Sequence, residues 1–134
     1  MPRTEDHLFV YGSLLSSIRH PVGERLRREA SLLGEGSMQG RLYRLRWYPG
    51  AVDSVDPDQR VFGEVYLLRS PERTLRWLDA YEGLQIGAAR DTQFERVARP
   101  VRLAGGRNVE AWVYLLKSGV RGLKWIRSGR WEPP

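Results

Sequence analysis

The stretch "HLFVYGSLLSS", residues 7–17, decides the fold, because it reads as a buried strand that stops abruptly. Residues 8–11 form a short aliphatic and aromatic run, and Gly12 and Ser13 interrupt it. Glycine allows a ligand to approach the main chain closely, and a sharp turn presents backbone N–H groups. We therefore expect a turn that can hold a carboxylate or an oxyanion. Most Gly-Ser turns bind nothing, so this motif needs support from elsewhere in the chain.

Length and composition predict one globular domain covering residues 1–134. The 134 residues are 41% hydrophobic and 28% charged, which suits a chain with a real core. Cysteine is absent, which excludes a disulfide framework and a thiolate metal site or nucleophile. His7 and His20 are thirteen positions apart without a clustered third ligand, so we interpret them as a surface and a loop histidine. The sequence implies no metal and no cofactor.

The charge pattern favours a solvated surface over a nucleic-acid site. The formal net charge is +6, and twenty of the 22 basic residues are arginines, which alternate with Glu and Asp along most of the chain. Residues 1–9 contain no apolar signal segment, and no stretch approaches the roughly 18 apolar residues of a membrane helix. We expect a cytoplasmic protein without a membrane partner; its oligomeric state is unknown.

Two helices are predicted from apolar spacing. In residues 21–33, apolar side chains recur at helical spacing after Pro21, which is tolerated at a first helical position. In residues 71–82, Ser70 is the expected N-cap and Gly83 the expected stop.

About five strands complete the predicted fold. The segments are residues 7–11, residues 42–47 followed by a turn at Pro49-Gly50, residues 61–69, and two strands of a hairpin within 94–117. Strands and helices in this order predict an α+β domain with a mostly antiparallel or mixed sheet, which can close into a small barrel.

An acidic side chain lies on the apolar side of the second predicted helix. At about 100° per residue, Leu75 and Leu78 are about 60° apart, and Glu82 falls between them. Asp79 lies nearer the rim of this stripe. Loss of water disfavours the charged form of a carboxyl and raises its pKa toward the range useful for proton transfer. Glu82 is thus a candidate acid/base, unless the helix frays before Gly83 and the side chain reaches water.

Two other residues are rival candidates for chemistry. Glu64 shares a face of the predicted strand 61–69 with large apolar residues and is desolvated if that face points inward. If water covers that face, Glu64 is an ordinary surface residue, which is the simpler interpretation. Ser13 is a weaker candidate nucleophile, since its surroundings are not G-x-S-x-G and neither histidine is spaced as its base.

Six short motifs occur in the same order as in a known protein family. They are "FVYGSL" (9–14), "YPG" (48–50), "VFGEVY" (61–66), "LDAYEG" (78–83), "AWVY" (111–114) and "SGRW" (128–131). Together they resemble the gamma-glutamylcyclotransferase-like family, most closely its gamma-glutamylamine cyclotransferase-like branch, over nearly the whole chain.

This resemblance implies a small mixed β-barrel flanked by two main helices, with a cavity at one end. It implies that Tyr11, Gly12, Ser13 and Leu14 bind the substrate through main-chain groups. It also implies that Glu82 is the catalytic acid/base. The implied reaction is cyclisation of a small-molecule gamma-glutamyl amine or peptide to 5-oxoproline with release of an amine. A catalytically silent ligand-binding or regulatory domain is the alternative, since a fold does not guarantee turnover.

The chain departs from the family pattern in two places. The family often has a tyrosine two positions before an arginine on the strand after the catalytic helix, whereas here Phe94 precedes Arg96. The segment 84–93 also differs from the usual short connection, which puts the leaving-group preference in doubt. A third interpretation is nucleic-acid binding through the basic and aromatic segment 121–131, in which Trp125 would stack on bases. We disfavour it, since the same segment matches the closing motif of the family.

Overall fold

The computed structural model describes residues 6–45, 48–84 and 94–132. Its elements are β1 (His7–Val10), α1 (Pro21–Glu29), β2 (Ala30–Gln39), β3 (Arg41–Arg44), β4 (Pro49–Val52), β5 (Arg60–Leu68), α2 (Pro71–Leu84), β6 (Phe94–Leu103), β7 (Asn108–Leu116) and β8 (Lys124–Ile126).

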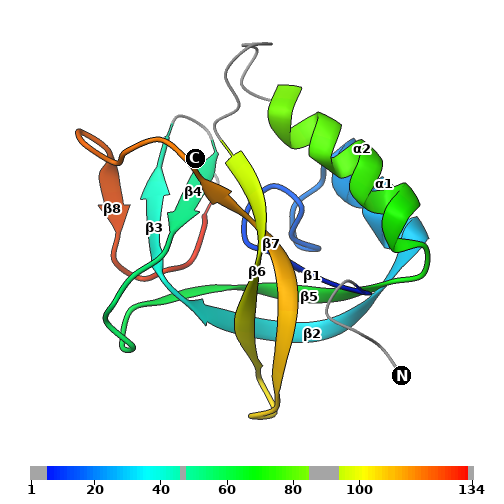
Figure 1. The fold of residues 1–134 in the computed structure, drawn as a ribbon, viewed down its shortest axis with the longest axis horizontal. Helices are drawn as coiled ribbons and strands as arrows, with labels where there is room; N and C mark the ends of the chain where they lie inside the picture. Colours follow the sequence, from blue (N-terminus) through cyan, green and yellow to red (C-terminus); the bar gives the residue numbers. More distant parts are fainter. Residues whose placement is uncertain (1–5, 46–47, 85–93, 133–134) are drawn as a thin grey trace.

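Five of these strands form a closed barrel in the order β1-β5-β2-β6-β7 (Figure 1). Neighbours pair antiparallel except β1 and β7, which run parallel where Leu8 lies opposite Trp112 and closes the barrel. β4, β3 and β8 form a separate three-stranded sheet beside the barrel, and the two helices pack at the opposite side. The predicted mixed barrel with two helices is therefore confirmed.

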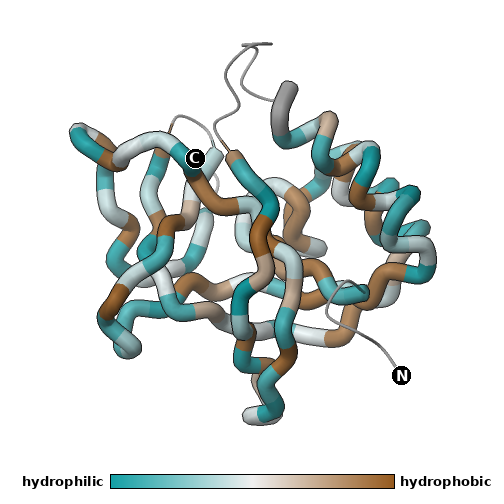
Figure 2. The backbone as a smooth tube through the Cα atoms, viewed as in Figure 1, coloured by the Kyte–Doolittle hydropathy of each residue, from teal (hydrophilic) through white to brown (hydrophobic). Residues whose placement is uncertain are grey.

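Strand β1 is buried on both faces. Leu8 and Val10 belong to a core that also contains residues of both helices, whereas Phe9 packs in a second core with Val65 and Val113. Alternate residues of a strand point to opposite faces, so one strand supplies both cores. Hydrophobic residues accordingly recur along the strands in Figure 2, while hydrophilic residues colour much of the visible side of the helices.

The first helix is shorter than the sequence predicts. α1 ends at Glu29, and Ala30 is already extended, with φ −142° and ψ 161°. From there β2 pairs with β5 along its whole length, starting with Ala30 opposite Leu68. The prediction of a helix through Leu33 is wrong, because this ladder of hydrogen bonds outweighs the helical spacing of the apolar residues. Leu33 is 40% exposed.

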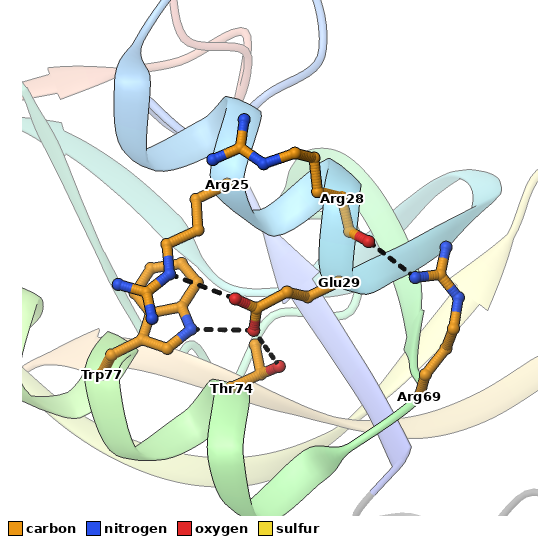
Figure 3. Close-up of polar contacts among 6 residues, drawn as sticks. All are labelled: Arg25, Arg28, Glu29, Arg69, Thr74 and Trp77. Carbon is orange, nitrogen blue, oxygen red and sulfur yellow. Dashed lines mark hydrogen bonds and ion pairs between the residues drawn. The ribbon is translucent and has the colours of Figure 1, made fainter.

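Arg69 marks the point where the helix stops. Its guanidinium donates to the carbonyl oxygens of Arg28 (2.7 Å, Figure 3) and Ala30 (3.3 Å). The last carbonyls of a helix lack intrahelical partners, and a cation near them is favourable. A residue distant in sequence therefore sets the boundary between α1 and β2.

The predicted turn at Pro49-Gly50 is also wrong. The chain reverses earlier, where the Leu45 N–H donates to the Tyr48 carbonyl (3.0 Å), and Pro49 begins β4. Proline is acceptable as the first residue of a strand. A Cβ on Gly50 would lie 2.9 Å from the Leu45 side chain, so this glycine allows close packing rather than a turn. With β4, β2 and β8 included, the described residues form eight strands rather than about five.

One of the two histidines lies elsewhere than predicted. His7 is buried in β1 rather than at the surface, because β1 is enclosed on both sides. His20 precedes α1 and caps it, with Nδ1 accepting a hydrogen bond from the Val22 N–H (3.2 Å).

Within residues 6–45, 48–84 and 94–132, no three His, Asp or Glu side chains are grouped as metal ligands. No helix in the same ranges has the length and apolarity needed to cross a membrane.

The carboxylate of Glu29 joins the two helices (Figure 3). Its Oε1 accepts hydrogen bonds from Thr74 Oγ1 (2.7 Å) and Trp77 Nε1 (2.9 Å), both on α2. Its Oε2 accepts one from Arg25 Nε (3.1 Å), and the Arg25 guanidinium stacks on the Trp77 ring at 4.2 Å. Thr74 is fully buried, so without Glu29 its hydroxyl would lack this partner.

Replacing Glu29 by Gln is expected to lower the free energy of unfolding by on the order of 1 kcal/mol at pH 7. Burial raises the pKa of Glu29, but hydrogen bonds from Trp77, Thr74 and Arg25 outweigh it and lower the pKa to about 2. The stabilisation is present above the unfolded value of 4.5 and is lost as pH falls toward about 2. Urea unfolding at several pH values between 7 and about 2.5 measures this loss.

Glu24→Gln is the matched control, because Glu24 lies exposed on the same helix. Its effect should stay within about 0.5 kcal/mol. An equal loss in the two variants, or a Glu29→Gln loss that persists unchanged to the lowest pH, would contradict the assignment.

Candidate active site

A cavity opens where β1 ends. It encloses about 410 Å³ of empty space, counting its open mouth. Its lining comes from β1 and the following turn, the start of β4, the end of α2, the start of β6 and the end of β7: Phe9, Val10, Tyr11, Gly12, Ser13, Leu14, Tyr48, Pro49, Glu82, Phe94 and Tyr114. All five residues that the resemblance assigns to the site, Tyr11 to Leu14 and Glu82, lie on this one cavity.

The turn after β1 lines the cavity and contains main-chain N–H groups without a partner among the described residues. The Leu15 N–H donates to the Gly12 carbonyl (3.0 Å), which folds the chain back after the strand. Within the described part of the chain, no hydrogen bond uses the N–H groups of Gly12, Ser13 or Leu14. A Cβ on Gly12 would lie 3.0 Å from two ring carbons of Pro49, so the side chain must be absent for this close approach. The turn therefore has donors that a bound anion can use.

Glu82 combines a cavity position with an unusual acidity. Removal from water, followed by the nearby charge of Asp79, raises the pKa of Glu82 from 4.5 to about 8. The carboxyl lies in the last turn of α2, where the helix dipole also disfavours negative charge and no basic residue is present. No hydrogen bond joins it to another described side chain. At neutral pH both of its protonation states are accessible, as proton transfer requires.

Asp79 lies one turn before Glu82 on α2 and is held by two partners. Arg96 on β6 donates through Nε to Oδ1 (2.8 Å) and through Nη2 to Oδ2 (3.1 Å). The Tyr114 hydroxyl on β7 donates to the same Oδ1 (2.6 Å). The pKa of Tyr114 is strongly raised by burial, by its bond to Asp79 and by the nearby charge of Glu82. Tyr114 thus remains protonated across the physiological range.

The phenol of Tyr11 is occupied by the fold. Its hydroxyl donates to the Tyr114 carbonyl (2.6 Å) and accepts from the Ala51 N–H (3.1 Å). Burial strongly raises the pKa of Tyr11, and so does the charge of Glu82, against a lowering contribution from Ala51. Tyr11 therefore ties β1, β4 and β7 together, and only its main chain and ring remain for a ligand.

The rival residues are placed differently. Glu64 accepts hydrogen bonds from the Ser16 N–H (2.7 Å) and hydroxyl (2.5 Å), which holds the loop after β1 against β5, and it does not line the cavity. Ser13 does line the cavity, but His20 contacts Tyr81 and its Nδ1 is engaged in the helix cap. Neither His20 nor His7 is among the lining residues of this cavity.

Outside β1, the lining residues Tyr48, Pro49 and Tyr114 received no role from the sequence. Tyr48 and Pro49 come from the "YPG" motif, and Tyr114 ends the "AWVY" motif. Both motifs can be recognised in the sequence. Whether their residues meet at one cavity depends on strand register, which the sequence does not show. The predicted effect of segment 84–93 on the cavity falls almost wholly outside the described residues.

The third interpretation concerned Trp125 and its neighbours. The Trp125 ring is flanked by the guanidiniums of Arg41 (4.6 Å) and Arg127 (4.2 Å). Trp131 is 7% exposed and packs in the second core. Trp125 is thus partly exposed beside two arginines, whereas Trp131 is a core residue.

A closed mixed barrel with a cavity at the end of β1 is the architecture that the resemblance implies. Residues 8–133 match the family model described as gamma-glutamyl cyclotransferase, AIG2-like. The chain belongs to this family.

Individual relatives agree with this assignment. The chain is 37% identical over 126 residues to the gamma-glutamylcyclotransferase family protein YtfP of Escherichia coli K12, covering 92% of this chain and 94% of that protein. An AIG2-like protein of Mus musculus superposes with a TM-score of 0.68 at 20% identity, with 96% of each chain covered. YkqA of Bacillus subtilis superposes with a TM-score of 0.69 at 20% identity; 94% of this chain spans 39% of that longer chain. At 20% identity, these two structures support the fold assignment alone.

Replacing Glu82 by Gln is expected to stabilise the protein at alkaline pH. The unfolded chain releases this proton near pH 4.5 and the folded chain near 8, so the wild type loses stability as pH rises between these values. The neutral glutamine variant escapes this loss and should be more stable by on the order of 2 kcal/mol at pH 8.5, with a much smaller difference near pH 4. Thermal unfolding of both proteins at the two pH values measures the gap. A gap independent of pH would show that the carboxyl lies in water.

Proposed function

We propose that the chain is an enzyme that cyclises a gamma-glutamyl amine or peptide to 5-oxoproline and releases an amine, with Glu82 as general acid/base. The observation that carries this proposal is the position of a desolvated carboxyl and unused main-chain donors on one cavity. Family membership supports it at the level of the reaction class.

Binding uses the turn after β1. The N–H groups of Gly12, Ser13 and Leu14 hold the substrate carboxylate or the oxyanion that forms at the γ-carbonyl. Apolar and aromatic walls, including Phe94 and Tyr48, exclude water from the remainder of the cavity. Phe94 offers no hydroxyl there, so the wall beside it favours an apolar part of the substrate.

The chemistry needs one proton carrier. Glu82 as carboxylate takes a proton from the substrate ammonium, and the neutral α-amine attacks the γ-carbonyl of the same molecule. The tetrahedral intermediate collapses as Glu82, now a carboxylic acid, protonates the departing nitrogen. The ring nitrogen then passes its remaining extra proton through the Glu82 carboxylate to the released amine. The products are the neutral five-membered lactam and an ammonium ion, and Glu82 returns to its starting carboxylate state. Attack within one molecule is fast when the cavity holds the chain in a folded geometry.

A catalytically silent domain with the same cavity is the second candidate. Phe94 stands where relatives of this family often have a tyrosine, and it lines the cavity beside Tyr48 with ring centroids 6.4 Å apart. Such a domain would bind a gamma-glutamyl compound or 5-oxoproline and leave it unchanged.

Incubation with a panel of gamma-glutamyl alkylamines and dipeptides, followed by chromatography for 5-oxoproline, tests the proposal. Wild-type protein is expected to form 5-oxoproline, and Glu82→Gln to reduce kcat by about 100-fold or more, because amide cannot carry the proton. The rate should rise with pH toward about 8, as Glu82 loses its proton. The titratable groups near the Glu82 carboxyl are Asp79, Tyr81, Tyr11 and Tyr114.

Glu72→Gln is the control, since Glu72 is exposed at the other end of the same helix and should leave kcat unchanged. Binding without any 5-oxoproline across the panel would favour the silent domain. Equal rates for the wild type and Glu82→Gln would remove Glu82 from the mechanism.

A further inference from the structure

We infer that Asp79 and Arg96 are positioning residues that turn the hydroxyl of Tyr114 into a hydrogen-bond acceptor for the α-amino group of the substrate. This inference rests on the proposed function, because it assigns the end of the cavity that recognises the gamma-glutamyl moiety. It adds a specificity-determining contact to the acid/base role of Glu82.

The hydrogen-bond geometry fixes the direction of the Tyr114 proton. Asp79 Oδ1 receives both the Tyr114 hydroxyl (2.6 Å) and Arg96 Nε (2.8 Å), and Oδ2 receives Arg96 Nη2 (3.1 Å). A carboxylate paired in this two-pronged manner with a guanidinium only accepts hydrogen bonds. The phenol is therefore the donor in its bond to Asp79.

Strand register places these groups together. Arg96 on β6 lies directly opposite Tyr114 on β7, so both side chains leave the same face of the barrel wall. The Arg96 guanidinium also stacks on the Trp112 ring at 4.3 Å, which further restricts its position. Asp79, Arg96 and Tyr114 are thus held together by one helix and two strands before any ligand binds.

The Tyr114 hydroxyl gives its proton to Asp79, and an Arg96 N–H also donates to the Tyr114 oxygen. This oxygen therefore offers the cavity its remaining lone pair and no proton. A phenol that is free to rotate could either donate or accept, whereas this one can only accept. A ligand group at this position must therefore be a donor. Arg96 does not line this cavity; it lines a separate surface pocket together with Asp79.

The cavity lining then includes two chemically distinct sets of polar groups. N–H donors of residues 12–14 suit a carboxylate or an oxyanion, while the Tyr114 oxygen and the Glu82 carboxyl suit an ammonium group. A gamma-glutamyl compound has both a free α-carboxylate and a free α-amine. The Tyr114 oxygen recognises the amine, and Glu82 then removes its proton.

Binding of two ligands that differ only in the amine tests this inference. The ligands are gamma-glutamyl methylamide and glutaric acid monomethylamide, which lacks the amine, and calorimetry is done on proteins that all carry Glu82→Gln to prevent turnover. The background protein is expected to prefer the amine ligand. Tyr114→Phe should reduce this preference about 10-fold while leaving the affinity for the amine-free ligand nearly unchanged. Asp79→Ala should reduce it as well, because the released hydroxyl is no longer held as an acceptor.

Asp53→Ala is the matched control. Asp53 pairs with Arg99 on the same strand β6, with two hydrogen bonds of 2.9 and 2.8 Å, but neither residue lines the cavity. It should leave the preference unchanged. Arg96→Met provides a second test of the pair if circular dichroism shows that Asp79→Ala fails to fold.

Two results would overturn the inference. Equal weakening of both ligands by Tyr114→Phe would show that Tyr114 only shapes the cavity. An unchanged preference in folded Asp79→Ala or Arg96→Met would show that the pair is merely structural. Because this assay measures binding, its outcome is independent of turnover. If no 5-oxoproline forms but the preference for the amine ligand is preserved, the proposed reaction is wrong and the inferred contact of Tyr114 with the amine is still supported.

Discussion

The burial of β1 on both faces is the constraint on which the remaining structure depends. A strand with Leu8 and Val10 in one core and Phe9 in another cannot shift by one residue without exchanging its two sets of side chains. Its end is therefore fixed, and with it the turn at Gly12 that follows. Tyr11 adds hydrogen bonds to two further strands. The turn for which we propose anion binding is thus held by a strand buried along its whole length, which suits a site that must be organised before the ligand arrives.

A second constraint positions the opposite wall of the cavity. Glu29 attaches α1 to α2 through the buried Thr74 and through Trp77, and His20 at the start of α1 contacts Tyr81 near the end of α2. Both contacts restrict rotation of α2 about its axis. The cavity position of Glu82 therefore depends partly on contacts of α2 made at Thr74 and Trp77, up to about two helical turns away.

Local pattern was sufficient for the features that depend on one element. The apolar run of β1, the period of α2 and the position of Glu82 on its apolar side could be predicted by counting, and the family motifs indicated the barrel. The predicted stop at Gly83 was wrong, since α2 continues to Leu84. The errors arose where partners distant in sequence decide. The end of α1 is set by β5 and Arg69, the β3–β4 reversal by close packing at Gly50, and the surroundings of His7 by barrel closure. Tyr114 joins Asp79 across 35 positions, a contact that no local period encodes.

The parallel seam of the barrel has a consequence for how the chain acquires its fold. β1 lies near the start of the chain, yet its closing neighbour is β7, with Leu8 opposite Trp112. Contacts of such large sequence separation form slowly, because the intervening loop must lose entropy before they contribute. During synthesis, β1 can pair with β5 well before β7 is made, but its other edge lacks a neighbour until Trp112 follows. That edge is therefore the part of the barrel that closes last.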